Sequence, residues 1–322
     1  VAVNSGTSAL EICLKAIDIK KGDEVIVPVQ TFVSTGSCVV NNGGTPIFCE
    51  IDQNHLIDIE DLKNKITPAT KAVIIVHFCG LIHPQIIELK NFLDEKNIIL
   101  IEDAAHAHGA KIDNTFAGNI GDFGCFSFYS TKIMTTAGEG GLISTNNSNY
   151  FNLCSSISAI GIDKESKKEI YHLSGSNNRM TELQAIAGLT QLNRLDDFVK
   201  HRNVIANIYR EILAEIVDSR IISFQDNPSR IMHSYWRFLV KIEDKNFKRD
   251  TVKAKMFSQG IAIDWPYTPL MHLQPAFKDT YKPNLSKSEL LAEKHLCLPI
   301  HMLIKAHDAE FIANKFIACF KS

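Results

Sequence analysis

Residues Ile98–Ala105 read IILIEDAA, an apolar run that ends abruptly in two carboxylates. Apolar runs without polar alternation are typical of strands that helices cover on both faces, as in a parallel sheet. The segments Ser8–Ile17 and His83–Asn97 have helical patterns and could cross from one such strand to the next. Three more runs complete the expected set of strands: Val25–Val27, Ile47–Ile51 and Val73–Val76. The first part of the chain is therefore predicted to be α/β, wound as βαβ units.

A long helix is predicted from Thr181 to Phe198, with a continuation through Val199–Leu213. Thr181 and Gln184 have the spacing of a capping box at its start. Apolar residues recur on one side of this helix, as expected for a face that packs in a core. This stripe consists of Leu183, Ile186, Leu189, Leu192 and Leu195.

The chain beyond this helix mixes a strand with amphipathic helices. Tyr235–Ile242 has the pattern of a strand, and Asp250–Ser258 that of a helix with Gly260 as its cap. Two further helices are predicted, namely Leu290–His295 after a capping box of Ser286 and Glu289, and Glu310–Phe320. We therefore expect a large domain over residues 1–199 and a smaller α+β domain over residues 200–322.

Composition and charge argue against several classes of protein. The 322 residues carry a net charge of −2 and no block of lysine or arginine, so nucleic acid is not an expected partner. The apolar runs are far too short to span a membrane, and no secretory signal is visible. Eight irregularly spaced cysteines in mostly apolar stretches indicate buried free thiols in a reducing cytoplasm. His106-x-His108 could begin a metal site, but no other ligand pair has recognisable spacing, so no metal is expected.

Three segments contain residue types that carry chemistry. Asp103 ends a buried strand, where it could face a ligand crevice or cap the next helix. Asn4–Ser8 (NSGTS) leads into a helix, and the amides and hydroxyls there suit a phosphate, although a plain capped turn has the same residues. Lys132 lies within Gly124–Gly141 (GCFSFYSTKIMTTAGEGG) at the edge of a predicted core strand, and an isolated lysine would ordinarily be a surface residue.

Together these segments supply what pyridoxal phosphate needs. A lysine amine such as that of Lys132 forms a Schiff base with the aldehyde. A carboxylate such as that of Asp103 keeps the pyridine nitrogen protonated, which makes the ring an electron sink. Ser127 could add its hydroxyl to the phosphate site. The glycines of the same region would let the backbone pass close to the cofactor, and they are Gly138, Gly140 and Gly141.

The chain resembles the DegT/DnrJ/StrS sugar aminotransferases, within the fold-type I pyridoxal phosphate enzymes, along nearly its whole length. The blocks that carry the resemblance are NSGTSAL (Asn4–Leu10), GDEVIVP (Gly22–Pro28), TFVST (Thr31–Thr35), IEDAAHAHGA (Ile101–Ala110), GDFGCFSFYSTK (Gly121–Lys132), GEGG (Gly138–Gly141), NNRMTELQA (Asn177–Ala185) and LPIH (Leu298–His301). The resemblance implies a large domain with a mainly parallel sheet flanked by helices, and a smaller C-terminal α+β domain. It also implies transfer of an amino group, from glutamate, to a keto group of a nucleotide-linked sugar, with pyridoxal 5'-phosphate as cofactor.

The resemblance also implies roles for single residues. Lys132 would form the Schiff base and act as the base of the 1,3-proton shift, and Asp103 would pair with the pyridine nitrogen. Phe32 would stack on the ring and His106 would lie beside it, although both could be ordinary packed residues. Gly6, Thr7, Ser8 and Ser127 would hold the phosphate.

A homodimer with shared active sites is implied as well. Asn177, and with it Arg179, matches a segment that crosses from a partner subunit toward the phosphate. A structural salt bridge is the other interpretation of Arg179.

Some features depart from the family's pattern. The block that usually reads Gly-Tyr-Asn-Tyr-Arg is GSNNR here (Gly175–Arg179), and Gln30 replaces an aromatic or asparagine residue. The chain begins at Val1 without a methionine, so we expect the family's N-terminal arm to be missing from it. The loops Ile160–Ser174 and Asp264–Phe277 are expected to decide substrate identity. His301 lies in a family block without an assignable role.

Other functions remain open on the same motifs. A ketocyclitol aminotransferase shares them. A sugar dehydratase on this scaffold replaces the lysine with histidine, so Lys132 argues against it. A non-catalytic sugar-sensing regulatory protein would not need the lysine, the acid and the phosphate cradle together.

Overall fold

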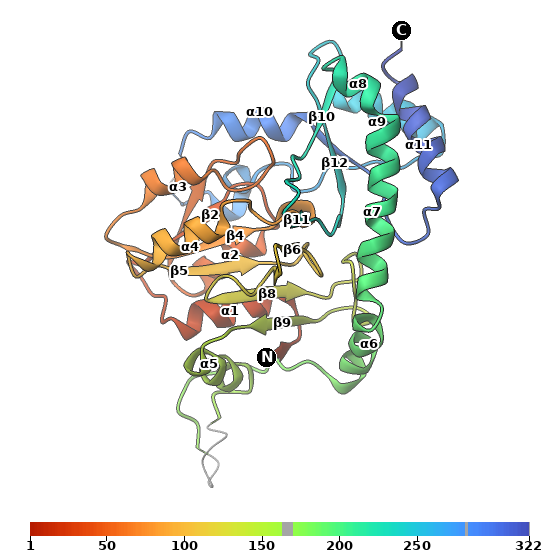
Figure 1. The fold of residues 1–322 in the computed structure, drawn as a ribbon. Helices are drawn as coiled ribbons and strands as arrows, with labels where there is room; N and C mark the ends of the chain where they lie inside the picture. Colours follow the sequence, from red (N-terminus) through yellow and green to blue (C-terminus); the bar gives the residue numbers. More distant parts are fainter. Residues whose placement is uncertain (163–169, 281–282, 322) are drawn as a thin grey trace.

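The computed structural model describes residues 1–162, 170–280 and 283–321. Within them, a seven-stranded sheet forms the centre of the larger part of the molecule (Figure 1). In spatial order its strands are β1 (Ala2–Val3), β9 (Gly141–Ser144), β8 (Phe123–Ser127), β5 (Ile99–Asp103), β4 (Thr70–Val76), β2 (Glu24–Pro28) and β3 (Thr45–Cys49). The strands from β8 to β3 run parallel, whereas β9 is antiparallel to both of its neighbours. The four predicted strands are all confirmed in the parallel part.

Helices cover both faces of this sheet, which explains the uninterrupted apolar runs. One face packs against α1 (Gly6–Ala16), α2 (Ser34–Asn41) and α5 (Ser148–Ser158), and the other against α3 (Ile59–Lys65) and α4 (Ile86–Asp94). Successive residues of β2 show the alternation directly, since Val25 and Val27 belong to the first core and Ile26 to the second. The α/β prediction for this part of the chain is confirmed.

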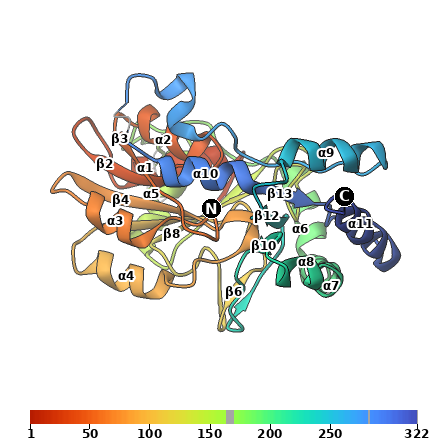
Figure 2. The ribbon, with the colours of Figure 1, turned by 90° about the horizontal axis from the view of Figure 1, so that it is seen from above.

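A three-stranded antiparallel sheet organises most of the C-terminal part, at one end of the molecule (Figures 1 and 2). Its strands are β10 (Ile222–Phe224), β12 (Phe238–Ile242) and β13 (His295–Leu298). The helices that share its core are α7 (Leu195–Ile212), α8 (Ala214–Asp218), α9 (Arg249–Ser258) and α11 (Ala306–Ala318). A third small sheet joins β11 (Ile231–Met232) to β6 (Lys111–Ile112) and β7 (Thr115–Phe116). The mixed α and β character predicted for this part is confirmed.

One segment of the C-terminal range packs on the large sheet. It contains the 3-10 turns η2 (Met271–Leu273) and η3 (Pro275–Phe277) and the helix α10 (Ser286–Lys294). Phe277 and Leu291 belong to the same core as Val25, and α10 lies with the N-terminal elements in Figures 1 and 2. The division into residues 1–199 and 200–322 stays a prediction.

The predicted long helix is wrong, because two helices replace it. α6 (Glu182–Leu192) ends before α7 begins, and the capping box of Thr181 and Gln184 at its start is confirmed. α6 lies at the periphery of the molecule (Figure 1). The exposed fractions of its apolar side chains are 80% for Leu183, 63% for Ile186, 62% for Leu189 and 52% for Leu192. The expectation that this stripe packs in the core of the chain is therefore also wrong.

The other C-terminal helices follow the sequence with one correction. α9 is followed by Gly260 at a φ of +77°, as predicted, and α11 begins four residues before the predicted start. α10 has no side-chain cap, because Leu285 is its N-cap residue and the Glu289 carboxylate instead accepts a hydrogen bond from His272. The capping box predicted for Ser286 and Glu289 is therefore wrong.

All eight cysteines are buried and free, as predicted. None of the helices in the described part of the chain is both long enough and apolar enough to cross a bilayer.

Candidate active site

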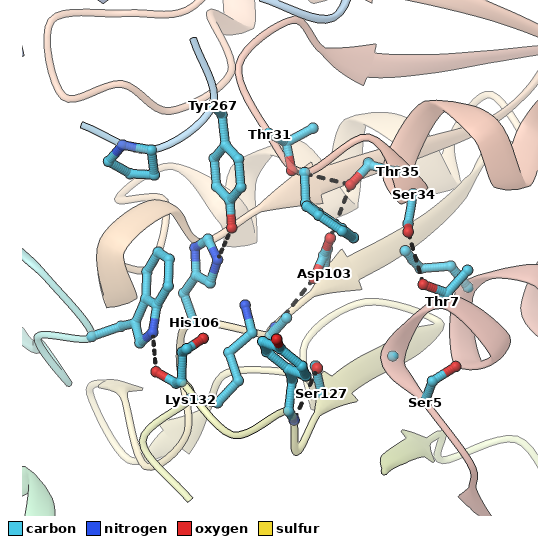
Figure 3. Close-up of a pocket in the computed structure, with 18 of the residues that line it drawn as sticks. Ser5, Thr7, Thr31, Ser34, Thr35, Asp103, His106, Ser127, Lys132 and Tyr267 are labelled. Atoms are coloured by element: carbon cyan, nitrogen blue, oxygen red, sulfur yellow. Dashed lines mark hydrogen bonds between the residues drawn. The ribbon is translucent and has the colours of Figure 1, made fainter. Parts of the chain in front are cut away.

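A cavity of about 770 Å³ lies at the carboxyl ends of the parallel strands (Figure 3). The N-terminus of α1, the β2–α2 loop, the ends of β5 and β8, and the β8–β9 loop all contribute to its wall. Two segments from the C-terminal part close it, namely 236–237 and 266–267. Seven of the residues singled out from the sequence line this cavity: Gly6, Thr7, Phe32, Asp103, His106, Ser127 and Lys132.

Strand alternation decides which of the two carboxylates at the end of β5 faces the cavity. Asp103 lines it, whereas the neighbouring Glu102 points to the opposite face of the sheet and is completely buried. Glu102 accepts hydrogen bonds from the backbone N–H groups of Gly118, Ile120 and Gly121 and from His77 Nε2. Burial alone would raise the pKa of Glu102, but His77 and these amides outweigh it and leave the pKa below its usual range.

The Asp103 carboxylate is held by fewer donors. Its Oδ2 accepts from Thr35 Oγ1 at 3.1 Å, and its Oδ1 accepts from the N–H of Ala105 at 3.2 Å. The Thr35 hydroxyl is in turn 3.0 Å from that of Thr31, so Thr31 donates to it (Figure 3). Burial raises the pKa of Asp103, and the nearby Lys132 only partly offsets this. Asp103 thus has capacity left for a further hydrogen-bond donor or cation in the cavity.

Lys132 follows β8 and directs its amine into the same cavity (Figure 3). Burial lowers its pKa, Asp103 raises it and Arg237 lowers it, and together they leave the pKa at about 8. Its Nζ lies 4.6 Å from the centre of the Trp236 ring and has no hydrogen-bond acceptor among the described residues. The Trp236 Nε1–H donates to Thr131 O at 2.8 Å, which fixes the residue before the lysine. The lowered pKa gives the amine a substantial neutral fraction near physiological pH, and the neutral form is free to react.

The N-terminal turns of α1 and α2 meet at another part of the cavity wall. Ser5 caps α1, and the hydroxyls of Thr7 and Ser34 lie 2.7 Å apart. A Cβ on Gly6 would lie 2.7 Å from the Cβ of Ser127, so only glycine allows this close approach. This part of the wall therefore combines the N-terminal amides of helices, the hydroxyls of Ser5, Thr7 and Ser34, and the backbone of a glycine. Such a cradle suits a phosphate.

An aromatic cluster forms the remaining wall. The rings of His106 and Trp236 stack with centres 3.8 Å apart, and His106 Nε2 lies 2.9 Å from the Tyr267 hydroxyl. Burial lowers the pKa of His106 well below its usual value, so the ring is neutral. Phe32 is 51% exposed and borders the cavity, with Tyr267 6.1 Å away, so the interpretation of Phe32 as a core residue is wrong.

Gln30, which departs from the family's pattern, is buried behind this wall. Its Oε1 lies 2.7 Å from His55 Nδ1, and its Nε2 lies 3.3 Å from His295 Nε2. His295 also contacts the carbonyl of Pro266, which borders the cavity. Gln30 therefore supports the 266–267 segment from behind rather than lining the cavity itself.

Three residues with an expected role do not line the cavity of their own chain, namely Ser8, Asn177 and Arg179. The Ser8 hydroxyl accepts a hydrogen bond from Ser5 within the first turn of α1. Asn177 forms a backbone bridge to Ala159, and Arg179 forms one to Val3. Of the two loops expected to decide substrate identity, 264–277 borders the cavity through Pro266 and Tyr267. In the other, 160–174, residues 163–169 lie outside the described residues.

Two of the three glycines that follow Lys132 stand where a side chain would not fit. A Cβ on Gly140 would lie 2.1 Å from Thr136 Oγ1, and one on Gly141 would lie 2.4 Å from Ser5 O, whereas Gly138 has open space around it.

His106 lines the cavity, but His108 lies in a separate apolar groove beside α6. Nowhere in residues 1–162, 170–280 and 283–321 do three or more His, Cys, Asp or Glu side chains form a group that could hold a metal ion.

Comparison with known proteins identifies the scaffold. A sequence model described as the DegT/DnrJ/EryC1/StrS aminotransferase family matches residues 1–317. The chain belongs to this family. Its position in the DegT/DnrJ/EryC1/StrS family agrees with the resemblance seen in the sequence blocks.

Individual relatives extend over most of the chain. The GDP-perosamine synthase of Caulobacter vibrioides is 33% identical over 96% of this chain and 82% of its own length. The UDP-N-acetyl-3-dehydro-alpha-D-glucosamine 3-aminotransferase of Acidithiobacillus ferrooxidans is 32% identical over 98% of this chain and 82% of its own length. The crystal structure of NtdA from Bacillus subtilis with bound cofactor PMP superposes with a TM-score of 0.91 at 27% identity, covering all of this chain and 73% of that one.

Pyridoxal phosphate is the cofactor of the DegT/DnrJ/EryC1/StrS aminotransferases, and the cavity fits it. The cradle at Gly6 suits the phosphate, the amine of Lys132 suits the aldehyde, and the Asp103 carboxylate has capacity for a ring N–H. These groups come from three separate segments of the chain, and the fold brings all three to one cavity.

Several cavity residues were not singled out from the sequence. They are Ser5, Thr31, Ser34, Thr35, Tyr129, Glu139, Trp236, Arg237 and Tyr267. Thr31 and Thr35 stand in the TFVST block, so their hydroxyls could have been noticed there. Trp236 and Arg237 lie within the predicted strand Tyr235–Ile242, more than 100 residues from Lys132, and no local pattern distinguishes them from core or surface residues.

Proposed function

We propose that this protein moves an amino group from glutamate onto a keto group of a nucleotide-linked sugar. The observation that carries the proposal is the placement of Lys132 and Asp103 on one cavity, beside a cradle that suits a phosphate. Two relatives named for GDP-linked and UDP-linked sugar products or substrates support a nucleotide-linked acceptor. The eight buried free thiols support a reducing cytoplasm as its location.

The cavity residues divide the work of holding the cofactor. Pyridoxal phosphate, when bound, takes up the amino group of the donor and passes it to the acceptor. Lys132 would hold it covalently through Nζ, and Gly6, Thr7 and Ser127 would hold its phosphate. Asp103 would accept a hydrogen bond from the ring nitrogen and keep a proton there. The positive charge so retained would lower the pKa of Asp103, which burial now raises.

Lys132 would also move the proton that amino transfer requires. A base must be neutral before it accepts a proton, and burial already lowers the pKa of Lys132 to about 8. The Trp236 ring beside Nζ shields the amine from water without offering an acceptor. Phe32, Tyr267 and His106 would bound the space in which the ring and the substrate lie.

Three alternatives are less well supported. A dehydratase of this scaffold would have histidine in place of Lys132. A sugar-sensing regulator would have no use for a buried amine with a lowered pKa opposite a carboxylate. A ketocyclitol aminotransferase would use the same residues, and the names of the two relatives favour a nucleotide-linked acceptor over it.

The test is a pair of half-reactions followed by absorbance. The cofactor-loaded protein should be yellow, lose that absorbance on addition of glutamate, and regain it with the correct keto-sugar nucleotide from a screened panel. Borohydride should fix the cofactor to Lys132, and Lys132→Ala should lower turnover by at least about 1,000-fold. Lys20→Ala, an exposed lysine, is the matched control. A Lys132→Ala variant with wild-type turnover would end the proposal.

We further propose that two copies of the chain form a homodimer with shared active sites. Asn177 and Arg179 lie outside the cavity of their own chain, which supports a role for them in the cavity of a partner. The exposed apolar stripe of α6 follows these residues directly, and an exposed stripe of this kind is typical of a protein interface. The pairing of copies would explain why this stripe has no cover within the chain.

Mixing of two inactive variants tests the shared site. Asn177→Ala and Lys132→Ala chains, unfolded and refolded together, should regain roughly a quarter of wild-type activity, because half of the dimers then carry one intact site of two. No recovery would place Asn177 in its own chain's site. Separately, Ile186→Glu should shift the molecular mass measured by light scattering to that of a monomer. Leu303→Glu should not, although Leu303 is an even more exposed apolar residue elsewhere.

A further inference from the structure

A second cavity, of about 460 Å³, borders the first. Trp236 and Arg237 line both of them. The rest of its wall comes from α7, the segment 260–264, the 297–301 block and α11. The family assignment and the proposed reaction give this cavity no role.

Arg202 on α7 is an unusual residue for the wall of such a cavity. It is only 6% exposed, and its Nη1 donates to the carbonyls of Tyr235 at 2.9 Å and Trp236 at 3.3 Å. Its Nε is buried without a hydrogen-bond acceptor, and no carboxylate within the described residues forms an ion pair with it. Burial of an unpaired guanidinium costs free energy unless an anion approaches it.

Arg237 adds a second guanidinium to the same wall. It forms an ion pair with Asp264 at 3.0 Å, and its guanidinium lies 4.9 Å from the centre of the Trp236 ring. Burial, followed by the charge of Arg237, lowers the pKa of Arg202 to about 10, so the two guanidinium groups are close enough to repel each other. Arg202 remains charged at neutral pH, and Asp264 is the acid that lines this cavity. Two positive charges therefore face one negative charge.

We propose that the second cavity is a subsite for an oxyanion of the phosphate class, held between Arg202 and Arg237. A guanidinium presents a planar fork of N–H donors that matches phosphate oxygens, and two such forks suit a diphosphate. His301, the family-block residue without a role, also lines this cavity and offers a further polar group. The anion could be the diphosphate of a nucleotide-linked substrate that extends past Trp236, or free diphosphate.

The subsite is tested by calorimetry on the cofactor-loaded protein after borohydride reduction, so that the phosphate cradle of the first cavity is already filled. Inorganic diphosphate and GDP are titrated separately at constant ionic strength. Arg237→Gln should weaken binding of the anion by roughly tenfold, and Arg202→Lys should weaken it several-fold. Asp264→Asn should strengthen binding, because it removes the carboxylate that competes for Arg237. Strengthening cannot come from a damaged fold.

Arg230→Gln is the matched control, because Arg230 is also a half-exposed arginine paired with an aspartate and lines neither cavity. It should leave both affinities unchanged. If GDP binds more tightly than diphosphate with the same dependence on Arg237, the anion belongs to the nucleotide of the substrate. If both bind equally, the subsite serves free diphosphate.

Affinities that do not respond to Arg237→Gln, Arg202→Lys or Asp264→Asn would overturn the inference. This result is distinct from failure of the proposed function, because anion binding is measured without any amino transfer. A protein that transfers amino groups could lack the subsite, and a protein with the subsite could lack the proposed acceptor.

Discussion

Glu102 and Asp103 are adjacent on β5, yet the two faces of the sheet give them opposite tasks. The Glu102 carboxylate receives four hydrogen bonds from the chain itself, and its pKa lies below its usual range. The Asp103 carboxylate receives two and has a raised pKa. A buried charge that the fold fully satisfies holds the structure together, whereas one that the fold satisfies only in part is available to a ligand.

The largest effect is expected from Asp103→Asn. Asparagine keeps the shape but cannot retain a proton on the ring nitrogen, so turnover should fall by about 1,000-fold. The free energy of unfolding of the cofactor-free protein should stay the same or rise, because a neutral side chain avoids the burial of a charge. Steady-state kinetics and denaturant unfolding measure the two quantities. Wild-type turnover in this variant would remove Asp103 from the proposed site.

Glu102→Gln should show the reverse pattern. Three backbone N–H groups and His77 would meet an amide that presents an oxygen on one side only, so the free energy of unfolding should fall by about 3 kcal/mol. The folded fraction should keep most of its turnover per molecule. Glu60→Gln, which breaks an exposed pair with Lys63, should cost far less. Loss of turnover without loss of stability in Glu102→Gln would contradict the comparison.

A smaller effect is expected in the pH dependence of Lys132. An amine attacks an aldehyde only when neutral, so the rate at which cofactor-free protein captures pyridoxal phosphate should rise with pH through about 8. Asp103 raises the pKa of Lys132, so the midpoint should move to lower pH in Asp103→Asn. Stopped-flow absorbance over a pH series gives both midpoints. An unchanged midpoint would mean that Asp103 is not charged in the empty cavity.

The smallest effect is expected from Thr35→Val. Valine has the shape of threonine but removes one hydrogen bond to Asp103, which should cost about 1 kcal/mol and lower turnover roughly fivefold. Thr31→Val is the control, since it removes only the outer hydroxyl and leaves the direct contact in place. If Thr31→Val lowered turnover more than Thr35→Val, Thr35 would not be the hydroxyl that supports Asp103 directly.

Much of the fold and part of the site could be predicted from the sequence. Apolar runs such as Val73–Val76 indicated the parallel sheet, because a strand buried on both faces has no polar positions. Lys132, Asp103 and Gly6 were found because each stands in a local block with a recognisable pattern. Ser8 was expected among the phosphate ligands; its hydroxyl accepts a hydrogen bond from Ser5 and does not line the cavity, and its role stays a prediction.

The two adjacent helices show where the pattern failed. α6 and α7 both carry apolar stripes, and the stripe of α7 is buried in residues such as Ile205 and Tyr209, while that of α6 is exposed at Leu183 and Ile186. Periodicity predicts that a helix has an apolar face, but it does not say whether the same chain covers that face. The break between the two helices, at Asn193 and Arg194, also had no strong local signal.

Local sequence patterns alone were enough to predict the α/β architecture and the family, and they indicated Lys132 and Asp103 as candidates for the reactive pair. Each of these predictions rests on a short block of neighbouring residues whose types together form a recognisable pattern. Only the tertiary structure decided that Trp236 lies beside Lys132, that Thr35 supports Asp103, and that Arg202 and Arg237 face one cavity. These contacts join segments far apart in the chain, and their geometry follows from how strands and helices pack, which no local pattern records.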